Sequence, residues 1–212
     1  MESKQRLKDL INRIIPDRYF VSRYDKKNYG IIFTFDDGPD PTFTPASLDV
    51  LDELGVSATY FLVGSYAERH RDIVRKIVAR GHLVGGHTYS HRPVVGLNMT
   101  ELDKEIIDNG KRLSDLCGRR VNLFRPPWGK LDIKSACYLF FKRVPTVMWS
   151  IDSMDYRKSG TSDIVTHVQR VGMRSGDIIL LHDDNGYTIE ALPLLAAAAR
   201  KRGINIANLD VK

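Results

Sequence analysis

The sequence has little cysteine, with only Cys117 and Cys137 among its 212 residues. Neither belongs to a paired metal-ligand motif or a redox motif, so a disulfide framework and a cysteine-based metal site are not indicated. Both cysteines fall in segments with helical patterns, and we expect two buried thiols. Long apolar runs are also lacking, because runs such as 178–181 are far shorter than the about 20 residues that a membrane-spanning helix needs.

The N-terminus as given does not resemble a secretory signal. Residues 1–6 do not lead into an apolar core of about 7–15 residues, and no small-residue cleavage site follows. We therefore expect a cytoplasmic protein, or a secreted one if this chain is a processed form.

The sequence does contain enough apolar residues for one core. Apolar residues make up 42% of the chain and charged residues 27%, and the length is usual for a single domain. The net charge of +6 and the pI of about 9.3 would attract anionic partners. The basic residues within 69–80 and 111–120, however, recur at helical spacing, which favours solvated helix faces. We expect no nucleic-acid partner.

The N-terminal segment 1–28 is expected to form an amphipathic helix and a lead-in to one domain spanning 29–212. Five apolar residues recur at helical spacing within 3–15 and form one stripe: Leu7, Leu10, Ile11, Ile14 and Ile15. Packing of this helix over the domain is the simpler interpretation. The alternative is peripheral contact between a basic amphipathic helix and a membrane surface.

From residue 30 onward, short apolar strands alternate with amphipathic helices. The predicted strands are 31–35, 58–63, 82–86, 122–125, 146–151, 177–182 and 204–208. The predicted helices are 45–54, 67–80, 100–117, 130–141, 162–171 and 187–202, with Thr100 as the N-cap of the third. This alternation predicts an α/β protein with a mainly parallel sheet, and about seven repeats indicate closure into a barrel.

Reactive side chains gather at or just beyond the ends of these strands. They are Asp36, Asp37, His87, Arg125, Asp152, Asp155 and His182. In parallel α/β barrels the carboxyl edge of the strands carries the chemistry.

Two pairs of residues in this set indicate a metal site. On a helical turn, His87 and His91 would share one face and could bind one ion, although such a pair is a weak signal alone. Adjacent carboxylates at Asp36 and Asp37 carry a like-charge cost that a metal or a cation would relieve, and a simple turn is the alternative. Two histidines and one carboxylate suit a hydrolytic metal, but iron oxygenases use the same ligands, so the set does not settle the chemistry.

Four ordered motifs resemble those of the polysaccharide deacetylase family, the NodB-homology domain of carbohydrate esterase family 4. They are Thr34-Phe35-Asp36-Asp37-Gly38-Pro39, His87-Thr88-Tyr89-Ser90-His91, Arg125-Pro126-Pro127-Trp128-Gly129 and Leu180-Leu181-His182-Asp183. The resemblance covers residues 29–208 and implies a distorted (β/α)7-type barrel.

The resemblance also implies roles for the reactive residues. Asp37, His87 and His91 would hold one divalent metal, usually zinc, with cobalt or nickel as alternatives. Asp36 would be the general base that activates a metal-bound water, and His182 would be the general acid that protonates the leaving amine.

Further roles implied by the resemblance concern positioning and the substrate pocket. Arg125 would pair with Asp36, and Asp155 would orient His182. The backbone N–H of Trp128 would stabilise the oxyanion, while Leu180 and Tyr156 would line a pocket for the acetyl methyl group. Tyr156 departs from the family pattern, because many members carry Trp there.

These features predict a metal-dependent enzyme that removes N-acetyl groups from GlcNAc-type units of an oligosaccharide, a polysaccharide or a carrier-linked glycan. An extracellular deacetylase of peptidoglycan, chitin or acetylxylan is an alternative with the same chemistry. A non-catalytic sugar-binding relative is a third interpretation. An iron-dependent oxygenase is less favoured, because it gives Asp36, Arg125 and His182 no joint role.

Overall fold

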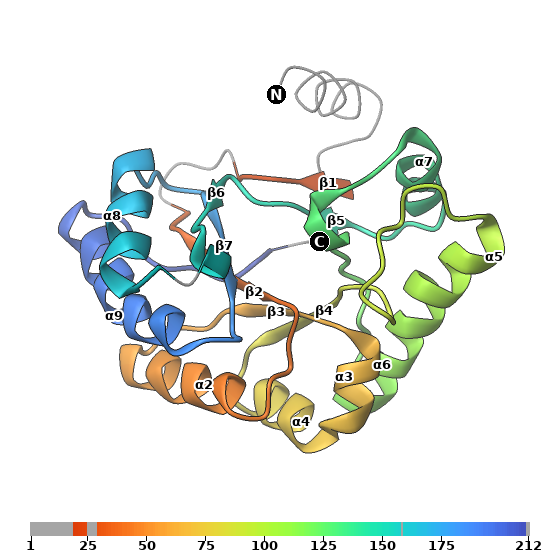
Figure 1. Cartoon of the computed structure of the whole chain (residues 1–212), viewed down its shortest axis with the longest axis horizontal. Helices are drawn as coiled ribbons and strands as arrows, with labels where there is room; N and C mark the ends of the chain where they lie inside the picture. Colours follow the sequence, from red (N-terminus) through yellow and green to blue (C-terminus); the bar gives the residue numbers. More distant parts are fainter. Residues whose placement is uncertain (1–18, 25–28, 158, 211–212) are drawn as a thin grey trace.

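The computed structural model describes residues 19–24, 29–157 and 159–210 (Figure 1). The strands are β1 (Phe20–Val21), β2 (Ile32–Asp36), β3 (Thr59–Leu62), β4 (Leu83–Gly86), β5 (Thr146–Val147), β6 (Ile151–Asp152) and β7 (Ile178–His182). The α-helices are α2 (Phe43–Leu54), α3 (Gly64–Arg69), α4 (Arg71–Ala79), α5 (Met99–Leu102), α6 (Asn109–Cys117), α7 (Ile133–Phe141), α8 (Thr161–Val171) and α9 (Gly186–Lys201). A π-helix, η2 (Asp103–Asp108), joins α5 to α6, and two 3₁₀ turns are η3 (Pro127–Gly129) and η4 (Asp155–Arg157).

The strands form a parallel sheet in the order β4-β3-β2-β7-β6. Beyond β4, Phe124 bridges Gly86 on one side and Thr146 of β5 on the other, and β5 pairs with β1. Because only residues 148–150 separate β5 from β6, the two ends of the sheet approach each other. The result is a distorted barrel with the helices on its outside (Figure 1).

The alternation of side chains along β2 decides what faces the barrel interior. Phe33 and Phe35 are fully buried and pack with Leu48 of α2 in the cluster beneath the outer helices. Ile32 packs in a separate inner cluster that includes Phe61 and Ile178. Thr34 and Asp36 share the inner face with Ile32 because successive strand residues point to opposite sides.

The register between β2 and β7 places the ends of two functional strands side by side. The parallel ladder runs from Ile32 opposite Ile178 to Asp36 opposite His182. Both strands are mostly apolar and buried, as expected for a parallel sheet that is covered on both faces. The two polar residues at their carboxyl ends therefore lie next to each other at one edge of the barrel.

Several predicted strands are shorter in the structure. The predicted strand 122–125 reduces to the single bridge at Phe124, because the Pro126-Pro127 sequence that follows has no N–H groups for a ladder. The predicted strand 146–151 divides into β5 and β6, and the last predicted strand, 204–208, reduces to the bridge between Ile31 and Ile206.

Two of the predicted helices differ in the structure. The helix predicted over 67–80 is two helices that meet at His70. The helix predicted to begin at Thr100 begins at Met99, and its N-cap is Asn98, whose side chain accepts the Glu101 N–H in a capping box. The prediction of Thr100 as the N-cap is wrong because Asn98 and Glu101 satisfy each other's backbone N–H groups.

Both cysteines are free thiols, Cys117 at the end of α6 and Cys137 within α7. Cys117 is buried, but Cys137 is only partly buried, which corrects the expectation of two buried thiols. The predicted helix 3–15 lies outside the described residues, so its packing and its membrane contact stay predictions, as does the domain boundary after residue 28. Among the described helices, none is long and apolar enough to cross a membrane.

Candidate active site

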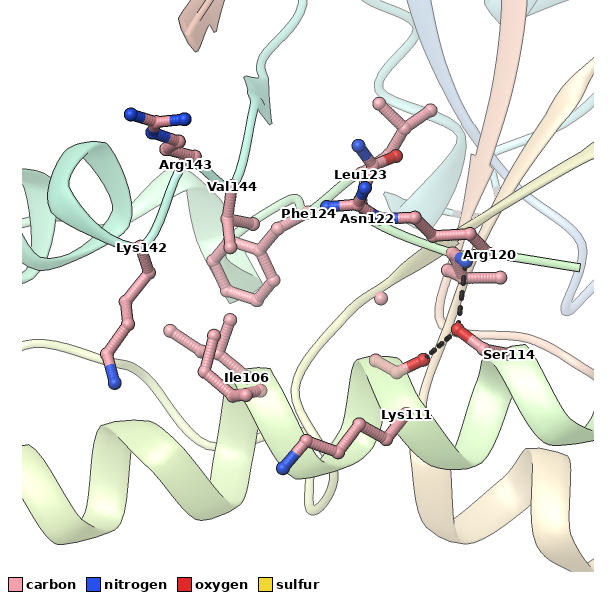
Figure 2. Close-up of a pocket in the computed structure, with 14 residues that line it drawn as sticks. Ile106, Lys111, Ser114, Arg120, Asn122, Leu123, Phe124, Lys142, Arg143 and Val144 are labelled. Atoms are coloured by element: carbon pink, nitrogen blue, oxygen red, sulfur yellow. Dashed lines mark hydrogen bonds between the residues drawn. The ribbon is translucent and has the colours of Figure 1, made fainter.

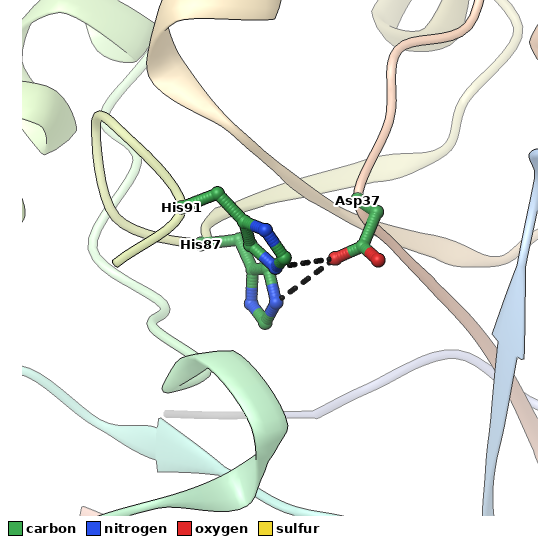
Figure 3. Close-up of side chains that lie close together, drawn as sticks. All are labelled: Asp37, His87 and His91. Atoms are coloured by element: carbon green, nitrogen blue, oxygen red, sulfur yellow. Dashed lines mark ion pairs between the residues drawn. The ribbon is translucent and has the colours of Figure 1, made fainter. Parts of the chain in front are cut away.

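Three potential metal ligands meet at the carboxyl edge of the barrel. Asp37 follows β2, and His87 and His91 lie in the loop after β4 (Figure 3). One oxygen of Asp37, Oδ1, lies 2.9 Å from His91 Nε2 and 3.3 Å from His87 Nε2. The three ligand atoms all lie within 4.8 Å of one another.

The turn after β2 separates the two neighbouring carboxylates. Asp37 has a positive φ of 71°, a left-handed conformation that Asp tolerates better than most residues. Asp36 remains 3% exposed and points into the barrel, whereas Asp37 is partly exposed and faces the histidines. The turn therefore points the two carboxylates in different directions, so that Asp37 contacts the histidines while Asp36 lies inside the barrel.

The two histidines lie on an irregular loop, which corrects the idea that a helical turn brings them together. Residues Thr88 and His91 both have φ of 59°, and no helix is assigned between 87 and 91. His87 Nδ1 donates a hydrogen bond to the carbonyl oxygen of Arg125 at 2.8 Å. Because a carbonyl can only accept, His87 Nε2 is left with the lone pair that a metal needs.

The donor set fits a divalent metal. One carboxylate and two imidazole nitrogens are ligands that zinc, cobalt and nickel accept, and three protein ligands leave positions for water and substrate. Burial alone would raise the pKa of Asp37. Hydrogen bonds with His87 and His91 lower it by more than burial raises it, so the pKa of Asp37 lies well below its usual range. Asp37 is therefore a carboxylate, as coordination requires.

Arg125 holds Asp36 from inside the barrel. The Arg125 side chain is fully buried, and its Nη1 donates to Asp36 Oδ1 at 2.7 Å and to Thr34 Oγ1 at 2.8 Å. Its other nitrogens donate to the carbonyl oxygens of Val147 and Met148. Burial lowers the pKa of Arg125, while Asp36 opposes that shift. Arg125 thus pairs with one oxygen of Asp36.

The second oxygen of Asp36 faces the ligand cluster. Asp36 Oδ2 lies 3.9 Å from His87 Nε2. The Asp36 carboxylate is therefore shared between a buried cation on one side and the metal ligands on the other, which suits a base that must stay ionised beside a bound water.

His182, the ladder partner of Asp36 on β7, forms a second dyad beside the cluster. Its Nδ1 lies 2.8 Å from Asp155 Oδ1, and its backbone N–H donates to Asp155 Oδ2 at 2.6 Å. Burial lowers the pKa of His182, but the bond to Asp155 outweighs it and raises the pKa to about 9. Its Nε2 lies 4.0 Å from Asp37 Oδ2, so the free nitrogen of the ring faces the ligand cluster.

Two aromatic residues flank the site. The Trp128 ring lies 4.8 Å from the His91 ring, and the Tyr156 ring meets the His182 ring edge-on at 6.0 Å. Trp128 is 54% exposed and Tyr156 49%. Leu180 is buried two residues before His182 and so shares its face of β7.

Nine of the ten candidate site residues are linked by these contacts: Asp36, Asp37, His87, His91, Arg125, Trp128, Asp155, Tyr156 and His182. The tenth, Leu180, is placed near them by its position on β7. Asp152, also predicted at a strand end, accepts the Met154 N–H and takes part in a turn.

Two residues that the sequence did not single out support the site. Thr188 donates to Asp155 Oδ2 at 2.9 Å, and Glu105 binds the loop between the histidines. Both lie within helical patterns that give no local signal.

A cavity of about 250 Å³ has a lining of its own, which Figure 2 shows. Its apolar wall includes Ile106, Phe124 and Val144, and Arg120 and Arg143 line it as well. None of the ten site residues contributes to its lining.

The chain is similar to known proteins over most of its length. A family model described as polysaccharide deacetylase matches residues 23–138. A peptidoglycan-N-acetylglucosamine deacetylase of Bacillus cereus is 37% identical over 187 residues, or 85% of this chain and 86% of that protein. A chitooligosaccharide deacetylase of Sinorhizobium fredii is 32% identical over 193 residues, or 84% of this chain and 89% of that protein.

The fold has solved counterparts. The crystal structure of a peptidoglycan N-acetylglucosamine deacetylase superposes with a TM-score of 0.85 at 31% identity and covers 91% of each chain. Fold and site together define a barrel-like α/β enzyme with a candidate metal centre at the carboxyl edge of its strands. The chain belongs to the polysaccharide deacetylase family, carbohydrate esterase family 4. The fold and the enzyme class expected from the sequence, a carbohydrate N-deacetylase, are thereby confirmed.

Proposed function

We propose that the protein hydrolyses the N-acetyl groups of GlcNAc-type units in an oligosaccharide, a polysaccharide or a carrier-linked glycan, with the help of one divalent metal. The observation that carries the proposal is the cluster of Asp37, His87 and His91, with Asp36 and His182 each about 4 Å from one of its members. The similar proteins named for peptidoglycan and for chitooligosaccharides support GlcNAc as the sugar.

Asp37, His87 and His91 would hold the metal, with zinc favoured and cobalt or nickel as alternatives. When bound, the metal would lower the pKa of a water molecule and polarise the acetamide carbonyl. His87 is oriented for this task by the Arg125 carbonyl oxygen, and Asp37 is kept ionised by both histidines.

Asp36 is the general base in this proposal. Its Oδ2 would take a proton from the attacking water, while its Oδ1 accepts a hydrogen bond from the Arg125 guanidinium. Because Arg125 makes four hydrogen bonds inside the barrel, it holds the Asp36 carboxylate at a fixed position relative to β2 and β5.

His182 is the general acid. Its Nε2–H would donate a proton to the leaving amine as the C–N bond breaks, since an amide anion is too poor a leaving group. Asp155 binds Nδ1 and stabilises the charged ring, which keeps the proton on His182 at neutral pH. Base and acid thus come from the ends of two neighbouring strands, β2 and β7.

Trp128, Leu180 and Tyr156 complete the substrate pocket in this proposal. The backbone N–H of Trp128 would bind the oxyanion, where one well-placed donor is worth about 3–4 kcal/mol. Leu180 and Tyr156 would contact the acetyl methyl group. Tyr156 also presents an exposed face on which a sugar ring can stack.

The decisive measurement is acetate release from a substrate panel by metal-loaded wild type, Asp36→Asn and the control Asp115→Asn, whose carboxylate is exposed on α6. The panel holds peptidoglycan fragments, chito-oligosaccharides, polymeric chitin, and lipid-linked and nucleotide-linked GlcNAc. We expect release by wild type and the control and a loss of about 10²–10⁴-fold in Asp36→Asn. The substrate that responds identifies the class, and equal release by all three proteins would refute Asp36 as the base.

A further inference from the structure

The loop that carries His87 and His91 is fixed by groups that do not touch the ligand cluster. On one side, the first two N–H groups of α3 bind its carbonyl groups. Gly64 N donates to Thr88 O at 3.0 Å, and Ser65 N donates to Tyr89 O at 2.9 Å. These bonds satisfy two free N–H groups at a helix start and hold one edge of the loop.

On the other side, a single carboxylate binds the amides of the loop. Glu105 Oε2 accepts the backbone N–H groups of Tyr89 and Ser90, each at 2.9 Å, and Oε1 accepts the Ser90 hydroxyl at 2.7 Å. These two residues lie between the predicted metal ligands. Any displacement of Glu105 would therefore move His91 relative to His87.

The conformation of the loop explains why such support is needed. Thr88 and His91 both occupy the left-handed region, where a residue with a side chain costs about 1–2 kcal/mol. Thr88 is β-branched, for which this conformation is especially unfavourable. The loop would relax toward ordinary backbone angles without contacts that fix both its carbonyl and its amide groups.

Glu105 is also largely withdrawn from solvent. It is only 8% exposed, and both of its carboxyl oxygens accept hydrogen bonds from the loop. A buried polar group without such partners is costly, so the three hydrogen bonds hold Glu105 and the loop against each other.

The helix around Glu105 is also unusual. Glu105 belongs to η2, a π-helical segment between two α-helices, and such π turns within α-helices are frequent at functional sites. The wider turn changes the angle between successive side chains and so determines which residue of this helix faces the loop.

We infer that Glu105 is a positioning residue of the metal centre, which holds the loop 87–91 so that both histidines can bind one ion. The inference rests on the metal site of the proposed function. It concerns metal affinity and not the identity of the substrate. Outer contacts of this kind change metal affinity by about 10–100-fold when they are removed.

The test measures Zn²⁺ affinity by competition with a fluorescent chelator, without any substrate, for wild type, Glu105→Ala and Glu105→Gln. Asp115→Ala is the control, because it removes an acidic group from the following helix without touching the loop. We expect Glu105→Ala to bind Zn²⁺ about 10–100-fold more weakly. Glu105→Gln should recover most of the affinity, since its amide oxygen can still accept both backbone N–H groups.

The absorption spectrum of the Co²⁺-loaded proteins gives a second readout. A displaced His91 should alter the visible bands in Glu105→Ala but not in Asp115→Ala. If folded Glu105→Ala matches the control in Zn²⁺ affinity and in spectrum, the inference is wrong. If Glu105→Ala does not fold, Ser90→Ala takes its place, because it removes one of the three hydrogen bonds to Glu105. An unchanged Zn²⁺ affinity in Ser90→Ala would then contradict the inference.

Failure of this inference is distinct from failure of the proposed function. Unchanged Zn²⁺ affinity in the variants would count against Glu105 alone. Tight Zn²⁺ binding by wild type without acetate release from any substrate would count against the proposed reaction and leave the role of Glu105 intact.

Discussion

At the residue scale, the protonation of His182 depends on Asp155. The hydrogen bond to Asp155 raises the pKa of His182 to about 9, so the acid form exists at neutral pH and is lost only as the pH rises through that value. Asp155→Asn removes the negative charge and should lower this pKa, because burial is then opposed only by the charges of Asp36 and Asp37. We expect the alkaline limb of the kcat profile to move by at least about one pH unit to lower pH.

A matched variant separates charge from packing at this site. Thr188→Val removes only the hydroxyl that donates to Asp155 Oδ2, and the carboxylate remains. The alkaline limb of Thr188→Val should therefore move less than that of Asp155→Asn. Identical profiles for Asp155→Asn and wild type would contradict the role of Asp155.

A second carboxyl near the site should make stability depend on pH. Asp183 is 1% exposed beneath the turn at Gly38 and is hydrogen-bonded to the Thr44 hydroxyl, and burial raises its pKa to about 7. A carboxyl whose pKa is higher in the folded state stabilises below its unfolded pKa, and this contribution is lost as the pH rises toward 7.

Asp183→Asn should remove that dependence. The variant's free energy of unfolding, relative to that of wild type, should rise progressively between pH 4 and pH 7. Above pH 7 the difference between the two proteins should stay constant. At about 1.4 kcal/mol per pKa unit, the gain has an upper bound of about 4 kcal/mol. Denaturant unfolding of both proteins at pH 5, 6, 7 and 8 measures the difference, and a constant difference would contradict the raised pKa.

At the element scale, the start of α5 determines the stability of the helix that carries Glu105. Asn98 and Glu101 form a reciprocal capping box there. Asn98→Ala should lower the free energy of unfolding by about 1 kcal/mol. Thr100→Ala should change it far less, because Thr100 lies inside the helix. Equal losses in the two variants, measured by urea unfolding, would contradict the cap.

The elements show which parts of the structure the sequence could predict. Strand β2 and the two carboxylates at its end, Asp36 and Asp37, were predictable, because a short apolar run followed by charged residues is a local pattern. The loop 87–91 was not. Its left-handed residues are held by Gly64 and Glu105, which lie more than ten residues away along the chain. Local propensity carries no information about such contacts.

The supporting residues were hidden for a related reason. Glu105 falls in a regular helical pattern, and the π turn that directs it to the loop leaves no mark in hydrophobic spacing. Thr188, likewise, is one polar residue in the first turn of α9, where a hydroxyl is common. The reactive residues were predictable because they belong to distinctive motifs. Glu105 and Thr188 were not, because each is a common residue type within a regular helical pattern.

At the scale of the whole molecule, metal binding should stabilise the fold. Asp37 follows β2, while His87 and His91 follow β4, so one ion would join two separate strand ends. Zn²⁺ at about 100 times its Kd should add about 2.7 kcal/mol, and a chelator should remove this gain. A chain of this length should then melt about 5–10 °C higher.

The His91→Ala variant is the control for this measurement. It lacks one ligand and should show little change in Tm when Zn²⁺ or chelator is added. A Tm that rises equally in wild type and His91→Ala would mean that the ion binds elsewhere, and the candidate metal centre would be wrong.

The register between β2 and β7 has a consequence for how this molecule can evolve. Asp36 and His182 face each other as ladder partners, so the spacing of neighbouring strands, about 4.8 Å, sets the distance between their backbones. The loops that follow can lengthen, shorten or change composition without altering that distance. Descendants of one ancestral gene could therefore acquire new glycan preferences through loop mutations alone while they inherit the same pair of proton-transfer groups.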